Sequence, residues 1–108
     1  MDLTQKVCVA CEGGVPPLNS VEADVLLKQI PGWKRNDEAT KLTRDFTFKN
    51  FAEALAFTNK VGALAEQEGH HPDIELAWGK VGISLTTHAI HGLSENDFIL
   101  AAKINTIA

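Results

Sequence analysis

Residues 66–88 read EQEGHHPDIELAWGKVGISLTTH, and this stretch decides the fold because a helix ends in it and two strands follow. Pro72 biases the residue before it towards an extended backbone, so His70 and His71 lie where the helix gives way to a strand. Apolar residues alternate over residues 74–78, and Gly79 turns the chain into a second alternating run. The stretch therefore predicts a helix end followed by a β-hairpin.

Three of the four histidines lie in this stretch: His70, His71 and His88. Because histidine titrates near neutral pH, such a cluster can supply both the acid and the base of a proton transfer. A second interpretation is structural, with an imidazolium at the helix C-terminus and His88 solvated at the end of the second strand. A third is a zinc site, but adjacent histidines on an extended segment point in opposite directions, so we expect no metal.

Two more titratable residues lie close to this cluster in sequence. Glu66 falls in the last turn of the predicted helix, where the helix dipole disfavours a negative charge, so a nearby imidazolium would stabilise it. His70, four residues further on, is the partner that we expect for Glu66. His91 follows the cluster beside a glycine and is expected to be a solvated loop histidine.

The remaining elements follow from capping signals and from the period of the apolar residues. They are a helix from Asn19 or Ser20 to about Ile30, strands at 33–35 and 41–48, a helix at 50–68, and a last helix that the capping box Ser94-x-x-Asp97 opens and that runs to about Thr106. Two hairpins with helices before, between and after them predict an α+β fold. We expect a two-layer sandwich in which a four-stranded antiparallel sheet carries three helices packed on one face.

The helix at 50–68 has a wide apolar band. Its predicted core stripe consists of Phe51, Ala54, Leu55, Thr58, Val61, Gly62 and Ala65. Phe57 and Leu64 lie off this stripe, so the band can serve a subunit contact as well as the core. We therefore expect a homodimer or a homotetramer.

The N-terminal residues show no sustained period and contain paired glycines and prolines. This pattern predicts a flexible arm over residues 1–18 and a single domain over 19–108. Cys8 and Cys11 form an isolated C-x-x-C pair, which is found in redox sites and as half of a zinc site. With no second cysteine pair in the chain, two thiols in a mobile arm are the favoured explanation, so the pair is assigned no function.

Composition excludes two classes of partner. The formal net charge of −4 gives no basic surface for the phosphates of a nucleic acid, so we expect no direct nucleic-acid binding. No apolar run approaches the roughly 20 residues that a membrane helix needs. We expect a cytoplasmic protein with no membrane contact.

The spaced pattern Glu66-x3-His70-His71-Pro72-x5-Trp78-x9-His88-x8-Asp97 resembles the signature of the pterin-4a-carbinolamine dehydratases. The runs around it also look like that family: CEGGVPPL at 11–18, Pro31-Gly32-Trp33, Phe46-x-Phe48-x-x-Phe51 and Gly92-Leu93-Ser94-Glu95. One position departs from the pattern, because Gly69 stands where some members carry an acidic residue before the histidine pair. The resemblance extends from about Cys11 onwards.

The resemblance implies a hydro-lyase that converts a 4a-hydroxytetrahydropterin to a quinonoid dihydropterin and water in tetrahydrobiopterin recycling, with no cofactor. It makes His70 and His88 the principal acid and base, with His71 assisting, and it leaves open which one donates the proton. The residues that it implies for pterin binding are His70, His71, Pro72, Thr87, His88, Ala89 and Ile90. Glu66 and Asp97 would orient the histidines.

Two alternatives remain open after the resemblance is taken into account. Trp78 occupies an aromatic position of the family and would wall the pocket, although a tryptophan on an alternating strand is more often a core residue. The family also includes a member that serves as a dimerisation cofactor for a homeodomain transcription factor. A protein-binding module that acts as a dimerisation or assembly cofactor is therefore the alternative function.

Overall fold

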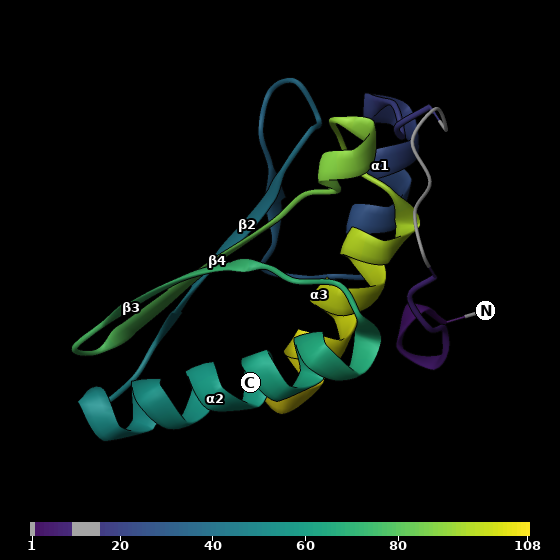
Figure 1. Cartoon of the computed structure of the whole chain (residues 1–108). Helices are drawn as coiled ribbons and strands as arrows, with labels where there is room; N and C mark the ends of the chain where they lie inside the picture. The colour runs from purple at the N-terminus through teal and green to yellow at the C-terminus, as the bar shows by residue number, and fades with distance from the viewer. Residues whose placement is uncertain (1, 10–15) are drawn as a thin grey trace.

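The computed structural model describes residues 2–9 and 16–108 and shows an α+β fold (Figure 1). Its elements are η1 (Leu3–Gln5), α1 (Ser20–Leu27), β1 (Lys34–Arg35), β2 (Leu42–Thr47), α2 (Phe51–Glu68), β3 (Asp73–Ala77), β4 (Lys80–Leu85), η2 (His88–Ile90) and α3 (Glu95–Ile107), where η marks a 3₁₀ helix. The four strands form one antiparallel sheet in the order β1-β2-β4-β3. The predicted sandwich of a four-stranded sheet and three helices is confirmed.

The two long pairings of the sheet set its two faces. β2 pairs with β4 from Leu42 opposite Leu85 to Thr47 opposite Lys80, and β3 pairs along the other edge of β4. Buried residues alternate with exposed or half-buried ones along β4, so one face is apolar and the other is polar. The helices cover the apolar face, and the polar face stays open (Figure 1).

Capping residues define the helix ends. Asn19 and Glu22 form a reciprocal capping box at α1, and the Asn50 side chain accepts a hydrogen bond from the N–H of Glu53 at the start of α2. Gly69, in the left-handed conformation with φ 66°, ends α2. The predicted helix starts are confirmed. Among the residues that the structure describes, no helix combines the length and apolarity needed to cross a membrane.

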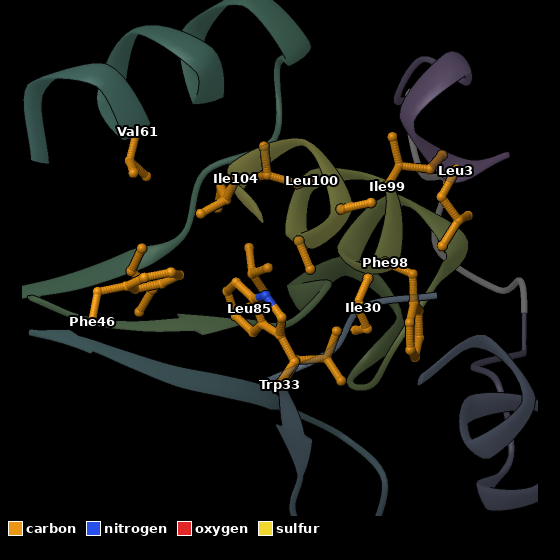
Figure 2. Close-up of a cluster of buried hydrophobic side chains, with 14 of the residues drawn as sticks. Leu3, Ile30, Trp33, Phe46, Val61, Leu85, Phe98, Ile99, Leu100 and Ile104 are labelled. Atoms are coloured by element: carbon orange, nitrogen blue, oxygen red, sulfur yellow. The ribbon is translucent and has the colours of Figure 1, made fainter. Parts of the chain in front are cut away.

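The core lies between the sheet and the helices (Figure 2). Phe57 of α2 is buried, and its ring lies 4.8 Å from that of Phe46 and 5.1 Å from that of Phe48, measured between centroids. Phe51 and Leu55, placed on the predicted core stripe, are 43% and 40% exposed. The predicted stripe is therefore wrong at Phe51 and Leu55, which it included, and at Phe57, which it left out. Contact with Phe46 and Phe48 turns the helix so that Phe57 faces inward.

The described part of the N-terminal segment differs from the flexible arm expected over residues 1–18. Leu3 is only 1% exposed and belongs to the core cluster, at the same end of it as Ile99 (Figure 2). The backbone of residues 8 and 9 is hydrogen-bonded to side chains of α2 and α3. The segment is held by one buried apolar residue, Leu3, and by hydrogen bonds to side chains. Neither kind of contact produces a periodic pattern, so the sequence contains no signal for them.

Candidate active site

The end of α2 positions His70. Gly69 turns the chain out of the helix, and the N–H of His70 still bonds to the carbonyl oxygen of Ala65 at 3.2 Å. Three residues later the chain enters β3 at Asp73. The predicted helix-to-strand junction at the two histidines is therefore confirmed.

His70 contacts a carboxylate that lies 27 residues further along the chain. Its Nε2 lies 2.6 Å from Oδ1 of Asp97, the third residue of α3. The side chain of His70 is 13% exposed and that of Asp97 is completely buried. A close pair of this kind, shielded from water, is stronger than a pair at the surface.

Two more residues, Thr87 and Ser94, complete the surroundings of Asp97. Its Oδ2 accepts hydrogen bonds from the Thr87 hydroxyl at 2.8 Å and from the backbone N–H of Ser94 at 3.0 Å. The Thr87 and Ser94 hydroxyl oxygens lie 2.7 Å apart. Asp97 thus caps α3 and fixes His70 at the same time. In the ionised form of Asp97, Nε2 of His70 is the donor, which leaves Nδ1 to exchange a proton with a ligand.

His71 belongs to a different pair. Its Nε2 hydrogen-bonds to Oε2 of Glu66, and the two side chains are 61% and 78% exposed. The expected pairing of Glu66 with His70 is therefore wrong. The rule that residues four apart share a face holds only inside a helix, and Gly69 ends the helix before His70 is reached.

His88 and its neighbours form η2, directly after Thr87. β4 ends at Leu85, so His88 lies in this 3₁₀ turn and not at the end of the strand as expected. His88 and Ala89 are exposed, whereas Ile90 is 7% exposed. His91 is exposed in the left-handed conformation with φ 55°, which confirms the loop position predicted for it.

Pro72 and Trp78 lie at opposite ends of β3. Pro72 is half-buried next to the histidine pair. Trp78 follows the last residue of β3 and is 68% exposed, so the expectation of a core tryptophan is wrong. The six extended steps from Pro72 to Trp78 span about 20 Å, so Trp78 lies far from His70 and His71 of its own chain.

The geometry also bears on the zinc alternative. Within residues 2–9 and 16–108, no three or more His, Cys, Asp or Glu side chains are grouped so that they could hold a metal ion. His70 and His71 each face a different carboxylate, as the alternation of an extended segment requires.

A hollow of about 500 Å³ lies elsewhere, over the open face of the sheet. Polar residues of β2, β3 and β4 line it, among them Asp45, Asp73 and Glu75, and no histidine does. Proton transfer at neutral pH suits imidazole better than exposed carboxylates. The region around His70 is therefore the better candidate for an active site, even though the hollow has a volume of about 500 Å³.

A second buried ion pair, which the sequence did not reveal, adjoins the candidate site. Oε2 of Glu68 lies 2.8 Å from Nζ of Lys103, and Oε1 accepts the N–H of Cys8 at 3.0 Å. Burial alone would raise the pKa of Glu68, but the bonds from Lys103 and Cys8 together with the Lys103 charge outweigh it, so this pKa lies below its ordinary value. Burial, followed by the charge of Glu68, raises the pKa of the Cys8 thiol to about 12. Cys11, the other half of the C-x-x-C pair, lies outside the described residues.

The Glu68 pair predicts a loss of stability in acid. A carboxyl group whose pKa is lowered by folding stabilises the folded state at neutral pH, and this contribution is lost as the pH falls below about 4, through the folded pKa. We expect Glu68→Gln to lower the free energy of unfolding at neutral pH and to differ little from wild type in acid. Urea unfolding of both proteins across this range measures the difference. Glu66→Gln, an exposed carboxylate of the same helix, is the control, and a gap for Glu68→Gln that persists in acid would contradict the prediction.

Comparison with protein families gives one match over most of the chain. A family model described as pterin 4 alpha carbinolamine dehydratase matches residues 16–107. A Methylococcus capsulatus protein provisionally named pterin-4-alpha-carbinolamine dehydratase is 55% identical over 106 residues, which cover 98% of this chain and 93% of the relative. A Rubrobacter xylanophilus protein with the same provisional name is 51% identical, with 98% of both chains covered.

Two solved structures are also similar. A Brucella melitensis protein described as a transcriptional coactivator/pterin dehydratase superposes with a TM-score of 0.80 at 35% identity, covering 85% of this chain and 98% of that one. A pterin dehydratase-like protein identified as a RuBisCO assembly factor in the alpha-carboxysome superposes with a TM-score of 0.62 at 27% identity, covering 71% and 89%.

Proposed function

Since the chain belongs to the pterin-4a-carbinolamine dehydratase family, a family of hydro-lyases, we propose that it removes water from a 4a-hydroxytetrahydropterin by histidine acid–base catalysis. The observation that carries this proposal is the contact between His70 and the buried Asp97. It joins residues 27 apart in the sequence, and among the residues that the structure describes the other ring nitrogen of this positioned imidazole has no hydrogen-bond partner.

The reaction requires one proton to be given and one to be taken. The hydroxyl group on C4a leaves poorly as hydroxide, so an acid protonates it as the C4a–O bond breaks and water departs. The electron pair of the neighbouring ring nitrogen forms the new double bond to C4a, and a base takes the proton of a ring N–H. The net change is the loss of water, so the substrate itself supplies the electrons.

We assign His70 and His88 as the principal acid and base. His70 is held by Asp97, which restricts the imidazole to one orientation. His88 directly follows Thr87, whose hydroxyl group bonds to the same Asp97, so the backbone that carries His88 is anchored close to the pair of His70 and Asp97. His71, Pro72, Ala89 and Ile90 flank these residues and are proposed to contact the pterin, with His71 assisting and with Glu66 orienting His71.

The test is the rate at which a freshly generated 4a-hydroxytetrahydropterin loses water, followed by absorbance in the presence of a chelator. We expect the wild type and His91→Ala to accelerate the loss and His88→Ala to do so far less. His91 is the matched control because it is exposed on the same turn, three residues from His88. A wild-type rate equal to that of buffer would end the catalytic proposal.

The second candidate is a protein-binding module. Two of the solved relatives carry names that refer to coactivation or to assembly. In this chain, Phe51 and Leu55 lie on α2 four residues apart and are 43% and 40% exposed, so they share one apolar strip of the helix surface. A variant carrying His70→Gln and His88→Ala would lose dehydration and keep partner binding, whereas Phe51→Ser with Leu55→Ser would do the reverse.

Four expectations from the sequence stay predictions. They are a homodimer or homotetramer, a cytoplasmic location, service in tetrahydrobiopterin recycling, and a pterin dehydratase domain over residues 19–108. Sedimentation of the purified protein measures the first of these directly.

A further inference from the structure

We infer that the N-terminal segment (residues 2–9) is a positioning element for the candidate active site, and that it acts through Asn96 and Glu68 to hold His70 against Asp97. This inference rests on the proposed function for its catalytic consequence. It assigns a role to residues that lie outside the histidine signature.

The segment is attached to the two helix ends that carry the site. The side-chain amide of Asn96 pairs with the backbone of Val9 in both directions: its Oδ1 accepts the N–H at 3.0 Å, and its Nδ2 donates to the carbonyl oxygen at 2.6 Å. The N–H of Cys8 donates to Glu68 at 3.0 Å. Lys6 forms an ion pair with Glu95 at 2.9 Å.

Each of these attachment points adjoins a residue of the candidate site. Asn96 directly precedes Asp97 in the first turn of α3, and Glu68 lies two residues before His70 at the end of α2. The N-terminal segment therefore bridges the C-terminus of α2 and the N-terminus of α3. The hydrogen bond between His70 and Asp97 spans the same two helix ends.

The bridge is buried enough to restrict movement. Asn96 is 6% exposed, and the side chain of Glu68 is 6% exposed and also bound by Lys103 of α3. Leu3, which is 1% exposed, fixes the start of the segment in the core. Figure 1 shows the segment, in purple, running beside α3. Releasing it would let the two helix ends shift, and a shift of about 1 Å at a reacting group can cost as much as 10²-fold in rate.

The test compares two asparagines of α3. Asn96→Ala removes the pairing with Val9. Asn105→Ala is the matched control, since Asn105 lies near the other end of α3 and bonds to Trp33, Arg44 and the carbonyl oxygen of Pro31. Val9→Pro is a second variant that removes the backbone N–H and also fixes φ of this residue. Val9 is 68% exposed and outside the helices and strands, so the core is left intact.

Two readouts are taken on each protein. The first is the NMR resonance of the hydrogen-bonded ring N–H of His70, recorded without substrate and assigned by its loss in His70→Gln. The second is kcat and KM for the dehydration of the 4a-hydroxytetrahydropterin. We expect Asn96→Ala and Val9→Pro to broaden or lose the resonance and to lower kcat about tenfold with little change in KM, and Asn105→Ala to keep both.

The outcomes separate this inference from the proposed function. If Asn96→Ala and Val9→Pro keep both the resonance and kcat, as Asn105→Ala is expected to do, the positioning role is overturned. If the wild type does not accelerate dehydration, the proposed function fails, and the resonance alone decides whether the segment holds His70 against Asp97.

Discussion

His70→Gln is expected to lower kcat for dehydration by about 10²- to 10⁴-fold, the usual contribution of a general acid or base. Glutamine can still donate a hydrogen bond to Asp97, so the buried carboxylate keeps a partner and the fold is conserved. It cannot exchange a proton at neutral pH, which removes the proposed chemistry alone. Stopped-flow absorbance with freshly generated substrate measures kcat, and circular dichroism confirms that the variant is folded.

His71→Gln is the matched comparison. His71 precedes the same proline but is 61% exposed and pairs with a carboxylate that is 78% exposed. Water screens such a pair, so we expect this variant to lose no more than about tenfold, less than the lower limit for a principal acid or base. Equal losses in the two variants would show that the buried contact of His70 has no special part in the reaction.

Asp97→Ala is expected to lower the free energy of unfolding by about 3 to 5 kcal/mol, which is the usual effect of removing one member of a buried pair. It leaves the donors of His70, Thr87 and Ser94 without their acceptor and removes one of the two hydrogen bonds of the capping box of α3. Since small domains are stable by only about 5 to 15 kcal/mol, the loss is a large share of the total. Urea unfolding at neutral pH measures it.

Glu66→Ala tests whether burial is the cause. This variant also removes a carboxylate from a histidine, but at the surface, where such pairs contribute less than about 1 kcal/mol. We expect the free energy of unfolding of Glu66→Ala to differ from that of the wild type by less than about 1 kcal/mol. If Asp97→Ala were equally mild, the pair with His70 would contribute no more than an exposed contact.

Local signals predicted the elements of the fold correctly. Asn19 begins α1 because its side chain takes an N–H that the first turn leaves unpaired, and such capping residues are visible in a sequence. Pro72 marks the entry to β3, and alternation marks β4. Each of these features depends on residues within a few positions of one another.

The sequence was less informative where the partners are distant. The capping pattern predicts the role of Asp97 at the start of α3, which the structure confirms, and the resemblance implies that Asp97 orients the histidines, but no local signal indicates that its partner is His70. The helical spacing paired Glu66 with the wrong histidine, because the left-handed Gly69 redirects the chain between them. Leu3 was missed altogether, since one apolar residue without neighbours of its kind has no period.

The attachment of the N-terminal segment to α3 also affects how the protein is made. Val9 pairs with Asn96, 87 residues later, and α3 supplies much of the buried cluster around Leu3. Of the elements described here, α3 leaves the ribosome last. Val9 therefore meets Asn96 only after α3 has been synthesised, whereas local contacts in α1 and α2 form earlier. Until then an apolar surface stays uncovered, and nascent chains at this stage are the ones most in need of protection by chaperones.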